Sequence, residues 1–430
     1  MSGPILLEGR NLVLSEGTGI ATYAAVLAST LVSLGHRLDI LYDTPATLTR
    51  NDAATNEIRV HDAAARPGRL GRILDHLHAH PFGISARPVG PSSALADLRF
   101  PGLSGFERQQ AGTRLFERAQ AHLLRYGRPL TVQPVRRPRL FHATHPAPIR
   151  VPKCPNVYTI HDLVPLRLPH ATLDSKRAFL ATVQQIARTA DLVVTVSEHS
   201  RRDIVELLGV EPDRVVNTYQ ATRGITRRAL SDAEREREIA GFGLVPDGYF
   251  LFVGAIEPKK NVAGLIDAYL ASGADRPLVI VGRNGWSHDD VDRRLGFLRE
   301  RSLAGSDRRG GPRVLRLPYL PTPIVTALLE SASALLFPSL YEGFGLPVLE
   351  ALEAGTPVLV SDAAALPEIV GDAGLLVPPT DVEAIAAAIR RLDADGELRR
   401  ELARRGPVAA DRFSPARYRE RIAAAYDRLL

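Results

Sequence analysis

The chain has 430 residues, of which 45% are hydrophobic and 24% are charged, and its formal net charge is +6. This length predicts two domains, and the composition is that of an ordinary globular protein, which excludes collagen-like, disordered and coiled-coil classes. The sequence lacks a run of about 18 uncharged apolar residues and a recognisable signal peptide, so we expect neither a spanning helix nor export. A single cysteine, Cys154, suits a reducing cytosol.

The predicted elements alternate between short apolar strands and amphipathic helices, which is the βαβ signature of a parallel sheet covered on both faces. In the first half we expect strands at 4–14, 37–42, 139–144, 156–160 and 191–196, with a helix at 20–33. A second series of strands is expected at 249–253, 277–281, 313–317, 334–337 and 357–360. The fold class is therefore α/β, with two tandem Rossmann-like, doubly wound domains.

The polar, charged stretch 220–245 marks the predicted domain boundary. This division gives an N-terminal domain at 1–219, a C-terminal domain at 220–413 and a final helix at 414–430 that crosses back toward the first domain. Two such domains would place their strand ends, and hence their ligand sites, against a shared cleft. The region 59–139 fits the alternation poorly, because it shows two helical stretches separated by a loop-like segment rich in proline and glycine, 81–105.

The segment from Gly254 to Asn261 joins a strand to a helix and carries two adjacent lysines. Only four of the 54 basic residues are lysines, so the pair Lys259 and Lys260 stands out against arginines that a GC-rich coding sequence accounts for. Asn261 is the expected N-cap of the following helix. Two ammonium groups at the positive end of a helix dipole are unfavourable unless an anion binds there, and phosphate is the obvious candidate, although a solvated lysine pair is the simpler alternative.

The segment from Glu342 to Gly355 follows another predicted strand and opens a helix at Pro347. Glycines at 343 and 345 let backbone N–H groups approach a ligand closely. Glu342 lies in the loop and Glu350 one turn into the helix, on the side opposite the apolar stripe, so both carboxylates can accept hydrogen bonds from sugar hydroxyls. The alternatives are a loop cap for Glu342 and a surface residue for Glu350.

Together these segments resemble the retaining nucleotide-sugar glycosyltransferases of the GT-B fold (family 4, group 1). Glu342 and Glu350 match the Glu-x7-Glu element of that family, and Gly254 to Asn261 matches its glycine-to-Lys-Asn turn. Further segments read like the family over most of the chain outside 59–139; they are 9–23, 158–163, 197–203, 278–286, which contains Gly282, and 366–379.

The resemblance implies roles for single residues. Lys260 would bind the donor diphosphate, beside Gly254, Asn261 and Gly282. Glu342 and the amides of the loop would hold the donor sugar, and Glu350 would bond the ribose. From the first domain, glycines would approach the phosphates and a histidine would face the sugar or acceptor. The residues concerned are Gly343, Phe344, Gly345 and Leu346 in the loop, and Gly17, Gly19 and His161 in the first domain.

Two departures from the family pattern concern the second cation on the diphosphate. Many relatives have an arginine where this chain has Ala255, and some have one where Thr22 stands, so Lys259 or Arg283 would have to compensate. Retention by double displacement needs an enzymatic nucleophile, and the sequence supplies no obvious one. We therefore favour attack on the face from which the leaving group departs, with a β-phosphate oxygen taking the acceptor proton.

Other signals carry less weight. Gly17 and Gly19 after a strand approach a dinucleotide fingerprint, but the third glycine is missing. The pairs Asp290/Asp292 and Asp393/Asp395 could hold a metal, yet surface acids are the simpler explanation, and we expect no metal and no other cofactor. His142 and His145 end a strand and are interpreted as ordinary hydrogen-bonded histidines, with a ligand contact as the alternative.

The resemblance thus implies a hexosyltransferase that acts on a glycan or lipid-linked acceptor in cell-surface polysaccharide assembly. Because the segment 257–261, Glu-Pro-Lys-Lys-Asn, resembles segments common in bacterial mannosyltransferases, we expect mannose from GDP-mannose as the first candidate donor. The alternatives are an epimerase or phosphorylase of the same fold and an inactive sugar-nucleotide-binding protein. Between Arg66 and Arg139, 13 arginines face only four acidic residues. This basic stretch favours an anionic surface at the inner face of the plasma membrane, and without interleaved aromatics it does not favour nucleic acid.

Overall fold

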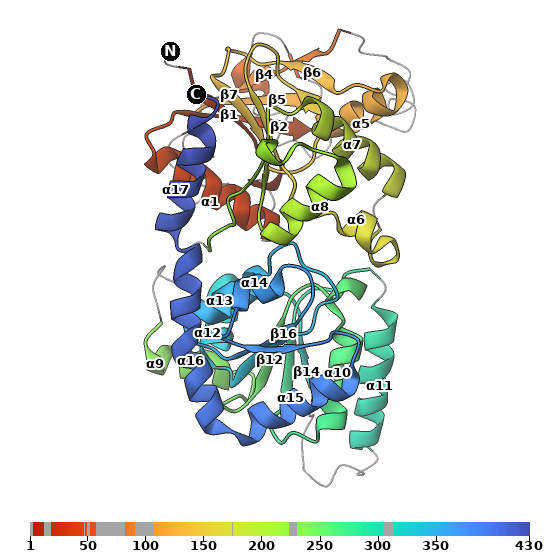
Figure 1. Cartoon of the computed structure of the whole chain (residues 1–430), viewed down its shortest axis with the longest axis vertical. Helices are drawn as coiled ribbons and strands as arrows, with labels where there is room; N and C mark the ends of the chain where they lie inside the picture. Colours follow the sequence, from red (N-terminus) through yellow and green to blue (C-terminus); the bar gives the residue numbers. More distant parts are fainter. Residues whose placement is uncertain are drawn as a thin grey trace.

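The computed structural model describes residues 3–12, 19–46, 48–49, 52–56, 82–90, 106–173, 175–222, 230–286, 288–303 and 314–430. Two α/β lobes are stacked along the long axis, and the last two helices run along one side of both lobes (Figure 1). The first lobe is formed by the N-terminal half of the chain and the second lobe by the C-terminal half.

The N-terminal domain is built on a sheet whose described strands lie in the order β11-β10-β9-β7-β1-β2-β5-β4. All neighbouring pairs are parallel except β4 with β5. Its strands are β1 (Ile5–Glu8), β2 (Leu38–Thr44), β4 (Arg87–Val89), β5 (Phe106–Thr113), β7 (Leu140–Ala143), β9 (Asn156–Thr159), β10 (Leu192–Thr195) and β11 (Val215–Asn217), and the small second sheet holds β3 (Ile84–Ser85), β6 (Leu130–Gln133) and β8 (Ile149–Arg150).

Apolar spacing explains why the helices of this domain cover the sheet. In α1, side chains at helical spacing, among them Tyr23, Leu27 and Leu31, are fully buried, and Gly35 follows the helix end with φ +82°. Ser197 caps α8 by accepting a hydrogen bond from the backbone N–H of Ser200 at 3.0 Å, as its position predicts. The helices are α1 (Gly19–Ser33), α5 (Leu115–Tyr126), α6 (Val164–Arg167), α7 (Lys176–Thr189) and α8 (Glu198–Leu208).

The C-terminal domain has a described sheet in which every neighbouring pair is parallel, in the order β14-β13-β12-β15-β16-β17. This is the 3-2-1-4-5-6 order of a dinucleotide-binding fold, and the order reverses between β12 and β15. Such a reversal places a crevice at the carboxyl ends of those two strands. The strands are β12 (Phe250–Val253), β13 (Leu278–Val281), β14 (Val314–Leu317), β15 (Ala334–Phe337), β16 (Val358–Ser361) and β17 (Leu375–Val377).

Helices on both faces bury the apolar strands of this sheet, whose β12, β15 and β16 side chains are almost all inaccessible. The helices of this domain are α9 (Asp232–Ala240), α10 (Val262–Ser272), α11 (Asp289–Leu303), α12 (Thr322–Ser331), α13 (Leu346–Ala354), α14 (Leu366–Val370), α15 (Val382–Ala394) and α16 (Gly396–Ala410), and the chain ends with α17 (Pro415–Asp427).

The last helix, α17, leaves the C-terminal domain and packs against α1 (Figure 1). Tyr418 and Tyr426 of α17 are buried on the N-terminal domain, where the Tyr426 hydroxyl hydrogen-bonds Nδ1 of His142. The Tyr418 ring meets the ring of Tyr23 edge-on, with the centroids 6.5 Å apart. The C-terminal end of the chain is therefore part of the N-terminal core.

The structure corrects two expectations about local structure. The predicted strand 4–14 is shorter, because β1 ends at Glu8 and a 3-10 turn, Arg10–Leu12, follows. Within the region 59–139 the second helical stretch is α5, but β5 is a central strand that the sequence did not indicate. The described part of the predicted loop 81–105, residues 82–90, contains the short strands β3 and β4. The first helical stretch, near residues 70–77, and the rest of that loop lie outside the described residues.

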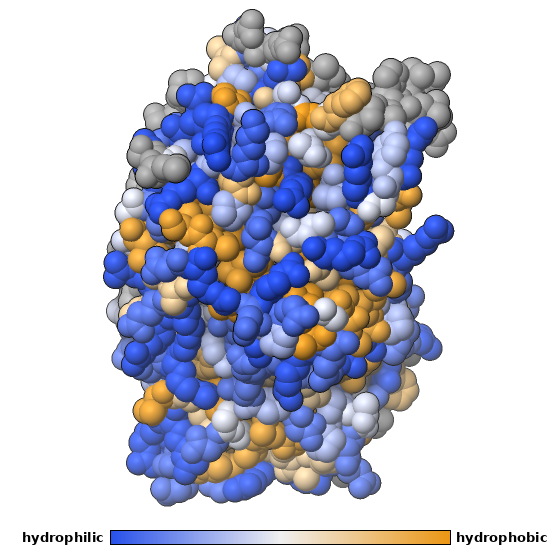
Figure 2. Space-filling model, turned by 45° about the horizontal axis from the view of Figure 1, so that its top comes forward, coloured by the Kyte–Doolittle hydropathy of each residue, from blue (hydrophilic) through white to orange (hydrophobic). Residues whose placement is uncertain are grey.

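The surface seen in Figure 2 is mostly hydrophilic, and apolar side chains gather near the middle of that face. Among the described helices, none is both long enough and apolar enough to cross a bilayer.

Candidate functional site

Two glycine turns follow the neighbouring strands β12 and β13, next to the point where the strand order reverses between β12 and β15. Gly254 ends β12 and Gly282 ends β13, with φ of +155° and +156°. The two backbones approach so closely that a Cβ on Gly282 would lie 1.9 Å from the carbonyl oxygen of Gly254. Only glycine fits this turn, and the close approach keeps the strand ends free of side chains.

Lys260 and Glu342 meet at this point of the sheet although they are far apart in the sequence. The ammonium nitrogen of Lys260 lies 2.6 Å from Oε1 of Glu342, and both side chains are largely buried, with 14% and 9% of their surface exposed. The Lys260 nitrogen also lies 4.8 Å from the centroid of the Phe337 ring. A cation and a carboxylate that are largely buried in this way interact more strongly than a pair on the surface. Both groups can also bind polar groups of a ligand.

Asn261 has a different role from the predicted one. It occupies the N-cap position of α10 with φ +53°, but its side chain does not cap the helix. Its Nδ2 atom donates instead to the carbonyl oxygens of Pro338, at 3.2 Å, and Pro379, at 2.6 Å. Asn261 therefore ties the lysine turn to the segment after β15, and the backbone of the two segments is joined again by the bond from Leu340 N to Lys259 O, at 2.7 Å.

The residues 338–345, between β15 and α13, form what we name the Glu342 loop. It ends at Gly345, the residue before α13. The first turn of α13 contains Pro347 and the buried Leu346. Phe344 points into the protein and contacts the ring of Phe413 edge-on at 5.5 Å. Glu350 is half-buried on α13, on the side opposite the fully buried Val348, as the helical spacing predicts.

The Glu342 loop lies directly against the N-terminal domain. A Cβ on Gly343 would come within 2.8 Å of the carbonyl oxygen of His161 and 2.9 Å of the Cβ of Asp162. At the start of α1, a Cβ on Gly19 would lie 3.6 Å from a methyl group of Leu346. The N-terminal ends of α1 and α13 thus come together across the two domains. The other glycine predicted to act here, Gly17, lies outside the described residues.

His161 is neutral in this structure. Its Nε2 lies 2.9 Å from the carbonyl oxygen of Thr144, which can only accept, so Nε2 carries the hydrogen and Nδ1 keeps a lone pair. Burial lowers the pKa of His161 to about 4, against the partly compensating bond to Thr144. The edge of the Tyr23 ring fixes the imidazole, with ring centroids 4.7 Å apart. Such a histidine can accept a hydrogen bond from a hydroxyl at neutral pH.

His142 and His145 have protein partners, as the simpler interpretation predicts. His142 is fully buried between Tyr426 and Thr159, and its Nε2 lies 2.8 Å from the Thr159 hydroxyl. Burial lowers its pKa to about 3. His145 lies 2.9 Å from Oε2 of the buried Glu8, and His145 is the main group that keeps the pKa of Glu8 below its usual range despite burial.

Several residues that join the two domains were missed by sequence reasoning. The hydroxyl of Tyr341, the residue before Glu342, hydrogen-bonds Asp203 of α8. The carboxylate of Glu368 on α14 accepts the backbone N–H groups of Glu198 and His199, at 3.1 and 3.0 Å, from the start of α8. These contacts join residues about 140 to 170 positions apart, and no local pattern signals them.

The remaining predicted candidates are Arg283 and the two acidic pairs. Arg283 is exposed, and its carbonyl accepts the backbone N–H of Ile256 at 3.0 Å. The two acidic pairs are engaged elsewhere: Asp292 contacts His288 and Arg316, Asp290 contacts Arg293, Asp393 contacts Arg276, and Asp395 caps α16. In the part of the chain that the structure describes, no three His, Cys, Asp or Glu side chains cluster as a metal site would.

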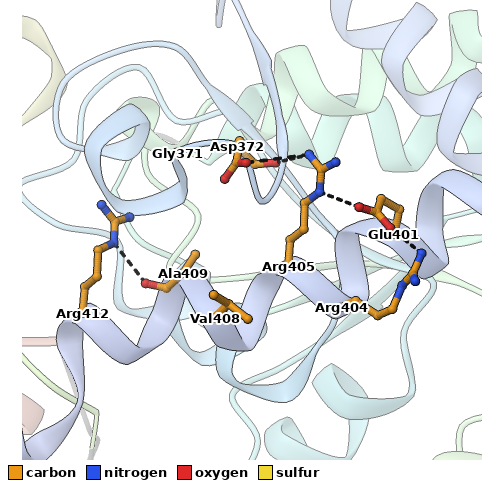
Figure 3. A pocket seen from close by; sticks show the side chains of 8 residues that line it. All are labelled: Gly371, Asp372, Glu401, Arg404, Arg405, Val408, Ala409 and Arg412. Carbon is orange, nitrogen blue, oxygen red and sulfur yellow. Dashed lines mark hydrogen bonds and ion pairs between the residues drawn. The ribbon is translucent and has the colours of Figure 1, made fainter.

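A hollow of about 470 Å³ opens on α16, away from these residues (Figure 3). Its arginines are already engaged: Arg405 pairs with Glu401 at 2.7 Å, Arg404 pairs with the same carboxylate, and Arg412 donates to the carbonyl of Ala409 at 3.2 Å. It shares no residue with the site described above, so we do not assign the chemistry to it.

Two family descriptions match the chain and together cover most of it. Residues 17–219 match Glycosyltransferase Family 4, and residues 234–408 match Glycosyl transferases group 1. O-antigen chain mannosyltransferase B of Escherichia coli is 37% identical over 265 residues, which are 60% of this chain and 66% of that protein. The serotype-specific mannosyltransferase WbdA of the same species is 28% identical over 280 residues. The match spans only 33% of WbdA's length.

Solved structures share the fold along the whole chain. Sucrose-phosphate synthase of Thermosynechococcus elongatus superposes with a TM-score of 0.64 at 19% identity, covering 99% of each chain. Anabaena HepE in complex with UDP and glucose has the same TM-score at 18% identity, covering 99% of this chain and 100% of that one. The glycosyltransferase WaaG, which is involved in lipopolysaccharide biosynthesis, follows with a TM-score of 0.60. The two domains therefore have the GT-B architecture.

Proposed function

Because the chain belongs to the glycosyltransferase family described by these two domains, we propose that it transfers a hexose, mannose from GDP-mannose, to a glycan or lipid-linked acceptor. The observation that carries the proposal is the Lys260–Glu342 pair at the reversal of strand order, where a doubly wound sheet binds nucleotides. The similarity to O-antigen mannosyltransferases supports the choice of sugar and a role in surface polysaccharide assembly.

The charges around the pair suit a nucleotide diphosphate sugar. Lys260 would bind the diphosphate, and the N-terminal ends of α1 and α13 would add their positive dipole ends, since neither first turn contains an acidic residue. Glu342 would then release Lys260 in part and accept hydrogen bonds from sugar hydroxyls. Glu350, half-buried on α13, would bond the ribose.

These groups would act mainly on the transition state. Cleavage of the anomeric C–O bond moves negative charge onto the diphosphate, so a fixed cation and two helix ends stabilise the transition state more than the ground state. We propose retention of configuration by attack on the leaving-group face. The acceptor proton passes to a β-phosphate oxygen, and neutral His161 accepts a hydrogen bond through Nδ1 and orients a sugar or acceptor hydroxyl. No metal and no other cofactor takes part in this scheme.

A membrane surface is the proposed location of the acceptor. Helix α5 exposes 53% of Leu124 and 36% of Tyr126 beside two arginines, Arg125 and Arg128, which lie over the Tyr126 ring. Exposed apolar residues flanked by arginines suit the headgroup region of an anionic bilayer. Flotation with vesicles containing an anionic lipid at low salt should retain the protein, and failure to float would remove the membrane from the proposal.

Product analysis tests the reaction. The purified protein is incubated with GDP-mannose and a mannose oligosaccharide, and GDP release and the anomeric configuration of the product are measured. We expect a mannosylated product with the donor's α configuration. Conversion of the nucleotide sugar without an acceptor would indicate an epimerase, and a need for inorganic phosphate would indicate a phosphorylase. An inverted product would contradict the proposed mechanism but not the transfer.

A further inference from the structure

Two residues of α8, in the N-terminal domain, hold the Glu342 loop of the C-terminal domain. Asp203 accepts the hydroxyl hydrogen of Tyr341, and the Ser200 hydroxyl lies 3.5 Å from the carbonyl oxygen of Gly343. These two contacts fall on either side of Glu342 in the sequence. The residue that pairs with Lys260 is therefore held between two attachments to the opposite domain.

The carboxylate of Asp203 divides its two oxygens between the domains. Oδ1 accepts from Nε and Nη2 of Arg167, at 3.0 and 2.5 Å, within the N-terminal domain. Oδ2 accepts from Tyr341 of the other domain, and the ring of His199 meets the Tyr341 ring edge-on at 5.3 Å. Asp203 is only 2% exposed and Tyr341 only 7% exposed, so the bond between them is shielded from water.

A hydrogen bond to an ionised, buried acceptor is stronger than one between neutral groups. Arg167 forms an ion pair with the same carboxylate. Burial and the neighbouring Asp203 raise the pKa of Tyr341 well above its usual range, so its hydroxyl stays a donor at every physiological pH. The contact is therefore a permanent feature of this arrangement of the two domains.

We propose that Asp203 is a positioning residue that, through Tyr341, fixes the Glu342 carboxylate for the donor sugar. The inference rests on the proposed function, in which Glu342 contacts the sugar and Lys260 the diphosphate. The other end of Glu342 is fixed within its own domain, since its backbone oxygen accepts the N–H of Ala365 at 3.3 Å and its side chain meets Lys260. The hydrogen bond from Tyr341 to Asp203 ties the orientation of this residue to a charged group of the N-terminal domain.

A general role in holding the domains together explains the contact less well. The domains are also joined by Glu368 of α14, whose carboxylate accepts the backbone N–H groups of Glu198 and His199 at the start of α8. These contacts lie outside the Glu342 loop and do not involve Tyr341. Removal of the Tyr341 hydroxyl leaves them, and the Arg167–Asp203 pair, in place.

The test compares Tyr341→Phe with Tyr219→Phe. The second variant is a matched control, because the Tyr219 hydroxyl also reaches the C-terminal domain, at 3.4 Å from Glu368, but not the Glu342 loop. The dissociation constants of GDP and GDP-mannose and the steady-state constants are measured for both. For Tyr341→Phe we expect GDP affinity within about twofold of wild type and a loss of about 10- to 100-fold in GDP-mannose affinity or kcat. Tyr219→Phe should leave the ratio of the two affinities unchanged.

A uniform loss on GDP and GDP-mannose, or no loss on either, would overturn the inference and leave Asp203 a structural residue. The variant Asp203→Asn should shift the same ratio, and its effect should not add to that of Tyr341→Phe. If Asp203→Asn does not fold, Tyr341→Phe decides alone. If wild type binds UDP-glucose rather than GDP-mannose, the donor assignment fails and the ratio is measured with UDP and UDP-glucose. If wild type binds no nucleotide sugar, the proposed function and this inference both fall.

Discussion

The two domains contribute to the same site by different means. The C-terminal side consists of glycine turns, one buried cation and one carboxylate, all within two short loops after β12 and β15. The N-terminal side consists of neutral, buried histidines and of helix ends, and these are fixed by hydrogen bonds that come from distant parts of the chain, including α17.

This difference follows from what each side has to bind. A diphosphate carries a fixed charge, and a preformed cation with helix N-termini suffices to bind it. An acceptor hydroxyl is neutral and has to be oriented, so a histidine with one defined tautomer and a locked ring is more useful than a charge. We expect substitutions in the two domains to affect the protein differently, and the following predictions test this.

The largest effect is expected on the C-terminal side, for Lys260→Ala. Loss of the cation should lower kcat/KM about 100- to 1000-fold, because charge that develops on the diphosphate is no longer stabilised. Rates of GDP release from GDP-mannose in the presence of acceptor measure this. Lys259→Ala is the matched control, since it removes the same charge from the adjacent position, whereas Lys260 is the lysine that forms the ion pair with Glu342. Equal losses in both variants would remove the special role of Lys260.

The N-terminal side should be sensitive to acid. His161 and His142 have folded-state pKa values of about 4 and 3, so the unfolded chain, with values near 6.5, takes up protons first as the pH falls. Their contribution is intact above about pH 6.5 and is lost progressively below it. At pH 5.5 each histidine should lower the free energy of unfolding by roughly 1 to 2 kcal/mol.

Urea unfolding at pH 7.5 and 5.5 measures this loss. Circular dichroism follows the whole chain, whereas the fluorescence of Trp286, the single tryptophan, follows the C-terminal domain. We expect the urea concentration at the midpoint of the dichroism transition to be lower at pH 5.5 than at pH 7.5. In a His142→Gln variant this difference should be roughly half as large. Identical unfolding free energies at the two pH values would contradict the assigned burial of the histidines.

The contact between the domains can be strained directly with Gly343→Ala. The added Cβ would lie 2.8 Å from the His161 carbonyl oxygen, so either the loop or the domain must move, at a cost of about 1–3 kcal/mol. We expect kcat/KM to fall roughly 10- to 100-fold, together with a loss of thermal stability no larger than this cost. Gly396→Ala, at a position where an added Cβ meets only the ends of two arginine side chains, is the control. Unchanged kinetics in Gly343→Ala would show that the two sides need not touch.

At the other end of the scale, metal removal should have no effect on turnover. Turnover should be the same in EDTA as in added Mg²⁺, since the acidic pairs Asp290/Asp292 and Asp393/Asp395 are engaged in ion pairs and a helix cap. Activity that is lost in EDTA and restored by Mg²⁺ or Mn²⁺ would contradict this prediction.

The same difference between the domains explains what the sequence could predict. Turns such as Gly254 to Lys260 and the start of α13 are set by local residues, so these elements were predicted from the chain alone, although α13 begins at Leu346, one residue before the predicted Pro347. Asn261 was assigned the wrong partner, because its side chain bonds to carbonyls 77 and 118 residues away. The strand β5 was missed since Glu107, Arg108 and Gln109 give it the composition of a surface loop. The contacts of Tyr341 and Tyr426 depend on tertiary structure.

Titration calorimetry of nucleotide sugars into the wild type and into Lys260→Ala tests the central claim most directly. The panel contains GDP-mannose, UDP-glucose, GDP and UDP. We predict that GDP-mannose binds the wild type more tightly than the other nucleotide sugar, and that Lys260→Ala weakens both GDP and GDP-mannose by about 100-fold or more. Unchanged binding of a nucleotide sugar in Lys260→Ala would contradict the assignment of the site.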